Sequence, residues 1–235
     1  MTAVPPAPFP PHGTPDAPRV AVRGEALLEV DPEIARITVA VRARGTDRRA
    51  ALEDLTRRNQ AAVELIKSYG DAVEKLETGL FSISPELTRR GRGEQVRAYH
   101  GQVNLEAEFS DFTALGELTT RLADLELTSV SGPWWALRPG SPAHGEARRR
   151  AVREAVKRAR EYAEALGARP VALVELSDVG ADGVQPYGAP IMAGSARMGG
   201  GYAMAEAAPE LDLEPRRQTV RAEVHARFVI TPPEL

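Results

Sequence analysis

Apolar and polar residues alternate with a period of two along several stretches of the chain. The clearest stretch is 220–230, where Val, Ala, Phe and Ile take one set of positions and Arg, Glu and His take the other. Because successive side chains of a strand point to opposite faces, the alternation predicts strands with one buried face. The predicted strands are residues 19–30, 35–43, 73–84, 96–109, 127–137, 170–176 and 220–230.

Two turn-forming sequences lie between strands that follow each other in the chain. Asp31-Pro32-Glu33 lies between the first two and predicts that they form an antiparallel hairpin. Residues 88–95 hold two glycines among charges and predict a second hairpin loop.

In three further stretches the apolar residues recur about every four positions, which predicts helices. The longest of these is 141–167. Ser141 is a suitable N-cap, Pro142 suits the first helical position, and Gly167 suits the end. Alanine recurs at every fourth residue, which predicts a flat apolar face packed on a sheet: Ala147, Ala151, Ala155, Ala159 and Ala163. The other helices are predicted at 47–69, capped by Thr46 or Asp47, and at 111–122, capped by Asp111.

The element order is therefore ββαββαβαββ, which indicates an α+β protein with a largely antiparallel sheet and its helices packed on one side. The second to fifth strands and their helices have the β-α-β-β-α-β order of a ferredoxin-like split βαβ unit. The long helix and the last two strands either extend this sheet or add a layer, so one domain and two lobes both stay open.

Two segments lack a pattern. Residues 1–18 are rich in proline and predict a disordered arm, leaving 19–235 as the folded part. Within it, residues 179–215 are rich in Gly, Ala, Pro and Met, and so long an insert is expected to be functional or disordered.

Several residues, taken in order, resemble the SIMPL-domain family, which includes a bacterial periplasmic immunogenic protein and a mammalian protein that binds a receptor-associated kinase. Gly24-Glu25 followed by Asp31-Pro32 is similar to the opening of the family, with Asp and Pro in inverted order. The strand with Tyr99 and Val103 and the alanine helix that ends in Leu166-Gly167 are similar to later parts. The strand at 78–86, which ends in Ser84-Pro85-Glu86, also resembles the family.

The resemblance implies that 19–235 is a SIMPL-like α+β domain that self-assembles into rings or larger hollow oligomers. It implies no catalytic residues, and it therefore favours a non-enzymatic protein. Many bacterial members are exported, whereas this sequence begins without a recognisable secretory signal, so the expected location is the cytoplasm.

Composition and charge limit the classes of binding partner that we expect for this protein. The formal net charge is −3, which disfavours a dedicated nucleic-acid binder, and no run of apolar residues is long enough to span a bilayer. The helix at 141–167 carries many arginines, so Arg148 to Arg160 remains a hypothesis for binding nucleic acid, but its i,i+4 pairs with Glu favour a solvated face. Cysteine is absent, which excludes disulfides and thiolate chemistry.

The residue patterns predict no catalytic, cofactor or metal site. His12, His100, His144 and His225 lack a second ligand at metal spacing, although His100 and His225 could meet across a sheet. The run Gly194 to Gly201 lacks the lysine of a phosphate loop. The pair Glu106 and Glu108 lies on a polar strand face and is expected to be solvated.

Candidate interface residues come from two places. Trp134 and Trp135 point to opposite faces of a strand, so one is expected in the core and the other at an interface. The insert supplies a second set of adaptable apolar side chains: Met192, Met198, Tyr202 and Met204.

The leading hypothesis is a self-assembling scaffold or partner-binding protein that is a homo-oligomer in solution. The alternative is a small-ligand binder or enzyme with 179–215 as a lid.

Overall fold

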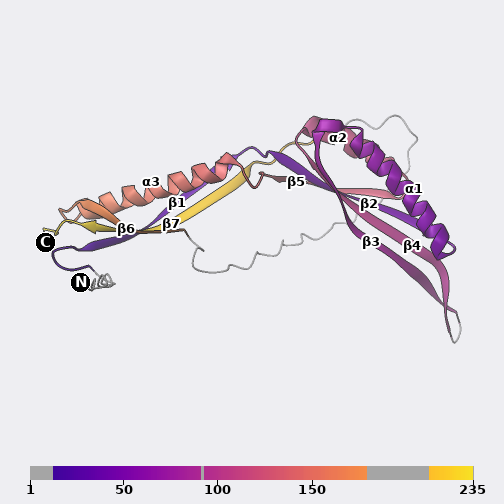
Figure 1. The fold of residues 1–235 in the computed structure, drawn as a ribbon, viewed down its shortest axis with the longest axis horizontal. Coiled ribbons are helices and arrows are strands. Elements are labelled where there is room, and N and C mark those ends of the chain that lie inside the picture. The colour runs from indigo at the N-terminus through magenta and orange to yellow at the C-terminus, as the bar shows by residue number, and fades with distance from the viewer. Residues whose placement is uncertain (1–12, 91–92, 179–211, 235) are drawn as a thin grey trace, which may run out of the picture. The chain divides into compact units, whose positions relative to one another are not determined.

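The computed structural model describes residues 13–90, 93–178 and 212–234. It contains three α-helices, one 3-10 turn and seven strands among these residues, and the α+β class is confirmed (Figure 1). Its elements are β1 (Arg19–Val30), β2 (Ile34–Gly45), α1 (Arg48–Lys67), η1 (Gly70–Ala72), β3 (Val73–Arg90), β4 (Gly93–Phe109), α2 (Phe112–Ala123), β5 (Thr128–Ala136), α3 (Pro142–Glu164), β6 (Pro170–Asp178) and β7 (Gln218–Ile230).

The strands form two sheets instead of one. A four-stranded sheet has the order β3-β4-β2-β5, and a three-stranded sheet has the order β1-β7-β6. The predicted β1–β2 hairpin is therefore wrong: β1 neighbours β7, and β2 lies between β4 and β5. The reason is that Asp31-Pro32-Glu33, which resembles a hairpin turn, instead carries the chain from one compact unit to the other, with the boundary after Val30.

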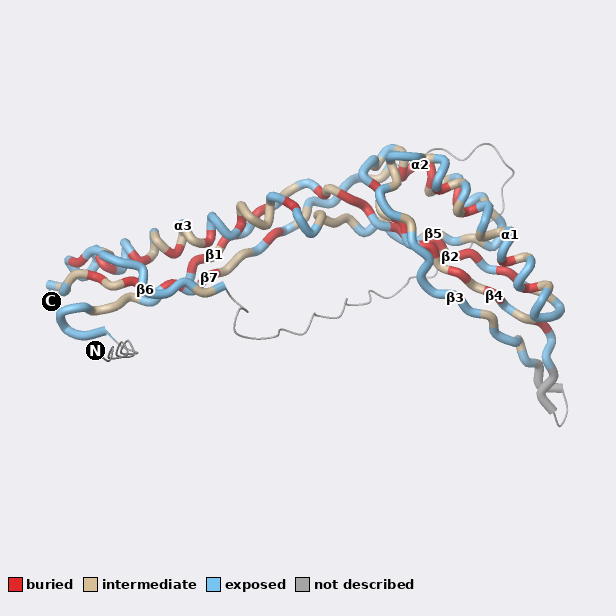
Figure 2. The backbone as a smooth tube through the Cα atoms, in the orientation of Figure 1, coloured by how far each residue is buried: buried red, intermediate tan, exposed pale blue. Residues whose placement is uncertain are grey.

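The four-stranded unit has the split βαβ arrangement. α1 connects β2 to β3, and β4 lies between these two strands, antiparallel to both. β5 pairs antiparallel with the other edge of β2. α1 and α2 both bury their apolar residues against the same face of this sheet, where Ile37, Val39, Leu105 and Phe109 are almost fully buried (Figure 2). In the described part of the chain, no helix covers the opposite face (Figure 1).

Side-chain caps begin each helix as the sequence predicts. The Asp47 carboxylate accepts a hydrogen bond from the Ala50 amide at the start of α1. Asp111 accepts from the amides of Thr113 and Ala114 at the start of α2, and Ser141 caps α3. Such caps satisfy backbone donors that the helix itself leaves free.

The three-stranded unit is built around the alanine face of α3. All five alanines of the period-four set are buried, and the predicted flat face is confirmed. Gly24 on β1 completes the fit, because a Cβ atom at this position would lie 2.0 Å from the Ala151 carbonyl oxygen and 2.7 Å from the Ala155 Cβ. Only glycine therefore allows α3 to approach the sheet this closely.

Some predicted features fall outside the described residues. These are the first twelve residues of the Pro-rich arm and most of the insert, with Met192, Met198, Tyr202 and Met204. Within residues 212–215 of the insert, Leu213 packs against the core of the four-stranded unit. No helix among the described residues has the length and apolar character that a bilayer crossing requires.

Candidate interaction surfaces

The two tryptophans of β5 lie in different environments, as the alternation predicts. Trp135 packs against the core of the four-stranded unit, with its ring edge-on to Phe112 at a centroid distance of 4.8 Å. Trp134 stands on the open face of the sheet with 52% of its surface exposed. Only Trp134 is therefore available to a partner.

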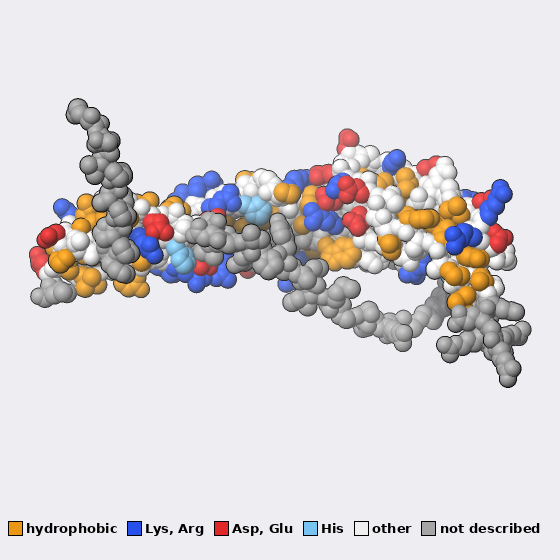
Figure 3. Space-filling model, turned by 60° about the horizontal axis from the view of Figure 1, so that its bottom comes forward, with side chains coloured by type: hydrophobic (Ala, Val, Ile, Leu, Met, Phe, Trp, Pro, Cys, Tyr) orange, Lys and Arg blue, Asp and Glu red, His pale blue; other side chains and the backbone are white. Residues whose placement is uncertain are grey.

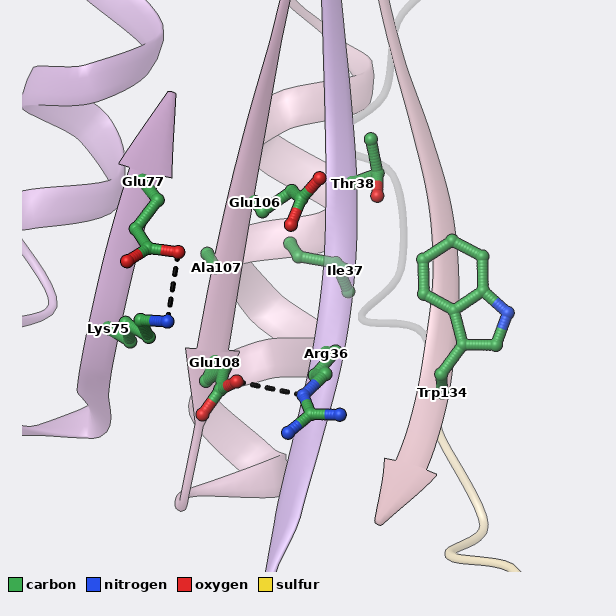
Figure 4. A pocket seen from close by; sticks show the side chains of 9 residues that line it. All are labelled: Arg36, Ile37, Thr38, Lys75, Glu77, Glu106, Ala107, Glu108 and Trp134. Carbon is green, nitrogen blue, oxygen red and sulfur yellow. Dashed lines mark hydrogen bonds and ion pairs between the residues drawn. The ribbon is translucent and has the colours of Figure 1, made fainter. Parts of the chain in front are cut away.

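Trp134 borders a depression of about 440 Å³ on this open face (Figure 4). The Arg36 Nε donates to Glu108 Oε1 at 2.8 Å, and Lys75 Nζ lies 2.9 Å from Glu77 Oε2. Glu77 raises the pKa of Lys75 by its hydrogen bond. Glu106 is exposed and makes no ion pair among the described residues, which contain no cluster of three or more potential metal ligands. Most charges here compensate one another, so the depression is a mixed polar surface.

The described histidines are dispersed. His100 Nε2 lies 2.8 Å from Glu86 Oε2, and together with Arg44 it lowers the pKa of the Glu86 carboxyl. His225 Nε2 lies 3.6 Å from Glu223 Oε1. The suggestion that His100 and His225 meet across a sheet is wrong, because β4 and β7 belong to different sheets.

The charged side chains on the outer face of α3 largely neutralise one another. Glu146 accepts hydrogen bonds from Arg149 and Arg150, and these arginines, Arg150 foremost, lower its pKa. Arg158 donates to Glu154 at 3.0 Å. Arg148 and Arg160 make no ion pair within the described part of the chain. Binding of nucleic acid through this helix remains a hypothesis.

Exposed apolar side chains concentrate around the turn from α3 to β6. Six of the fourteen large exposed apolar side chains of the described residues occur within this short stretch, and we name them the β6 surface: Tyr162, Leu166, Val171, Leu173, Val174 and Leu176. β6 is an edge strand of its sheet, and no strand of the described residues lies on its outer side. Figure 3 shows hydrophobic side chains gathered at one end of this unit.

Sequence reasoning missed the β6 surface. The run 170–176 is almost continuously apolar, which is typical of a strand buried on both faces. In the structure β6 lies at an edge, and Leu173 and Val171 are 53% and 64% exposed. The apolar run itself was the available signal, but it does not reveal edge position.

A second apolar concentration lies on the β3–β4 hairpin. The last pair between β2 and β4 is Gly45 with Tyr99, and beyond it β4 pairs only with β3. We name this part, residues 86–90 and 93–98, the β3–β4 ribbon. Leu87 and Val96 are directly opposite each other in it and are 50% and 49% exposed. Opposite residues of an antiparallel pair point to the same side, so these two form one apolar spot.

Comparisons with known proteins identify the family. The family model "SIMPL: Protein of unknown function (DUF541)" matches residues 20–228. No curated protein matches the chain. Among solved structures, a presumed amidohydrolase/peptidase from Burkholderia cenocepacia is 19% identical, covers 57% of this chain and has a TM-score of 0.27. The chain spans 33% of that protein, and a likeness this low supports no inference about activity. The family match extends over nearly the whole folded part of the chain and confirms the resemblance, so this protein belongs to the SIMPL family.

Proposed function

We propose that this protein is a non-enzymatic SIMPL-family protein that self-assembles and acts as a scaffold or binding partner. The observation that carries the proposal is the β6 surface. β6 is an edge strand, and it exposes the apolar side chains of Val171, Leu173 and Leu176. Both properties favour association with another chain.

The energetic argument is that assembly removes this surface from water. Burying a large aliphatic side chain from full exposure contributes about 1.5–3 kcal/mol. Because Leu173, Val171 and Leu176 are about half exposed, each has about 1 kcal/mol left to gain. Burial of several such side chains offsets a part of the entropic cost of association.

The test replaces Leu173 and Leu176 together by lysine and compares absolute masses by light scattering. We expect the wild type to be a multimer of the 25.4 kDa chain and the L173K/L176K variant to be smaller. The control is Leu52→Lys, which places one lysine at an apolar residue of α1 that is 43% exposed and belongs to the other unit. A wild-type monomer at micromolar concentration, or an unchanged mass of the double variant, would refute the proposal.

A further inference from the structure

The four-stranded sheet has a depression at the point where β2 stops and β4 continues. It measures about 300 Å³, and we name it the arginine notch after its lining: Arg44, Gly45, Thr46, Arg97 and Ala98. Gly45 forms the last pair of β2 with β4 and lets the start of α1 approach, because a Cβ atom there would lie 2.3 Å from the Ala51 nitrogen. Two strand ends and a helix start therefore fix the rim of the notch.

The charged side chains in this lining are both cations. Arg44 and Arg97 come from β2 and β4, and their side chains are 48% and 62% exposed. Thr46 is also exposed and adds a hydroxyl. Unlike the depression at Trp134, the notch has no carboxylate among its described lining residues. Guanidinium groups bind phosphates and carboxylates through paired N–H donors, so this lining is suited to an anion.

The neighbouring Glu86 shows that these donors converge on an anion. Arg44 donates to Glu86 Oε2 from Nε at 3.2 Å and from Nη2 at 2.8 Å. His100 Nε2 lies 2.8 Å from the same oxygen, and Arg97 Nη1 lies 3.6 Å from Glu86 Oε1. His100 and Arg44 lower the pKa of the Glu86 carboxyl. This part of the surface therefore stabilises negative charge.

Glu86 alone does not compensate the positive charge. Residues 42–48 and 96–100 together with Glu86 contain four arginines and two carboxylates, a net charge of +2 with His100 neutral, in a chain whose total is −3. Asp47, the second carboxylate, caps α1. Arg42 is exposed, lies on the same sheet face as Arg44 and makes no ion pair among the described residues. The excess of two positive charges matches a dianion.

We propose that the arginine notch binds the phosphate group of a small phosphate monoester. Such a group carries close to two negative charges and has three strong acceptor oxygens, so it can accept hydrogen bonds from Arg44 and Arg97 together. A volume of about 300 Å³ is at the lower end for ligand sites and suits a small molecule. Nucleic acid fits less well, because each of its phosphates carries one charge and this chain is acidic. The proposal does not depend on self-assembly.

The experiment titrates inorganic phosphate into the full-length protein by calorimetry, at about pH 8 so that phosphate is mostly a dianion. We expect Arg44→Gln and Arg97→Gln each to weaken binding about tenfold, because each removes a charged donor. Arg36→Gln is the matched control. Arg36 lies on the same strand as Arg44, is 47% exposed and pairs with Glu108 at 2.8 Å, as Arg44 pairs with Glu86. Its variant should keep the wild-type affinity within about twofold.

Glu86→Gln distinguishes recognition of phosphate from a structural role of the arginines. Glutamine keeps an oxygen to which Arg44 can donate, but it removes the competing charge, so we expect phosphate to bind about threefold to fivefold more tightly. Absence of binding to the wild type would overturn the proposal. Equal losses in R44Q and R36Q, or an E86Q variant that binds no more tightly than the wild type, would also overturn it.

Two further comparisons identify the source of the phosphate group. Glycerol phosphate should bind with the same dependence on Arg44 as inorganic phosphate. Phosphatidylcholine vesicles that contain phosphatidic acid, or single-stranded DNA, would overturn the proposal if they bound while glycerol phosphate did not. A monomer that binds phosphate would refute self-assembly alone, and a multimer that binds none would refute the phosphate site alone.

Discussion

At the scale of single residues, the approach of α3 to its sheet depends on Gly24. The space that a methyl group would need is filled by backbone atoms of α3, at 2.0 Å from the Ala151 oxygen and 2.7 Å from the Ala155 nitrogen. Backbone atoms cannot rotate away as a side chain can. A larger residue therefore has to displace the helix.

We predict that Gly24→Ala lowers the free energy of unfolding of the three-stranded unit by about 3 kcal/mol, the upper end of the usual cost of overpacking. Gly140→Ala is the matched control, because a Cβ there has no neighbour within 4 Å. Thermal or urea unfolding of both variants measures the difference. Equal stability of the two would show that the helix does not pack as closely as described.

The adjacent tryptophans give a second contrast between residues. Trp135→Ala removes an aromatic contact with Phe112 and a part of the core, and we expect it to cost about 3 kcal/mol. Trp134→Ala alters an exposed side chain and should change the free energy of unfolding by less than about 0.5 kcal/mol. Unfolding curves of the two variants check this, and a larger loss for Trp134→Ala would contradict the assignment of faces.

At the scale of elements, most strands and helices could be predicted from the sequence, but not which strands are neighbours. Alternation in β2 and β4 predicts a buried face and that face is found, because burial is local to each strand. Pairing depends on where the chain goes after a turn. Asp31-Pro32 has the same chemistry whether the next strand returns alongside β1 or enters another sheet, so the β1–β2 hairpin was predicted wrongly.

The difference between local burial and strand pairing also explains which candidate surfaces could be predicted from the sequence. Alternation along one strand predicts that one of Trp134 and Trp135 is exposed, and the structure shows that it is Trp134. The β6 surface depends on β6 being an edge strand, and the β3–β4 ribbon depends on β2 ending at Gly45 while β4 continues. Both are properties of strand order and relative length, which no local pattern records.

The ion pairs of α3 lead to a prediction on pH. Arg150 and Arg149 lower the pKa of Glu146 below its ordinary 4.5, so the folded state binds the proton less tightly than the unfolded state. The stability from this carboxylate is therefore present above pH 4.5 and is lost as the pH falls through the lowered pKa. Thermal midpoints of Glu146→Gln should fall less steeply than those of the wild type below pH 4.5.

Glu164→Gln is the control for this prediction, because Glu164 lies on the same helix and makes no ion pair among the described residues. Its midpoints should follow the wild-type curve. Identical acid dependence for Glu146→Gln and Glu164→Gln would show that the arginine pairs of Glu146 do not persist in solution.

At the scale of the whole molecule, the chain forms two compact units: a four-stranded sheet that packs against α1 and α2, and a three-stranded sheet that packs against α3. Among the described residues, each unit has exposed apolar side chains: the β6 surface in one, and Leu87 and Val96 of the β3–β4 ribbon in the other. Together they hold most of the large exposed apolar side chains outside the cores. Exposed apolar side chains of this kind favour the self-assembly that we propose.

The measurement that tests this account most directly is the absolute mass of the full-length protein in solution, by light scattering over a range of micromolar concentrations. We predict a defined multimer of the 25.4 kDa chain that dissociates on dilution. A mass of 25.4 kDa at every concentration would contradict self-assembly, and with it the role assigned to the β6 surface.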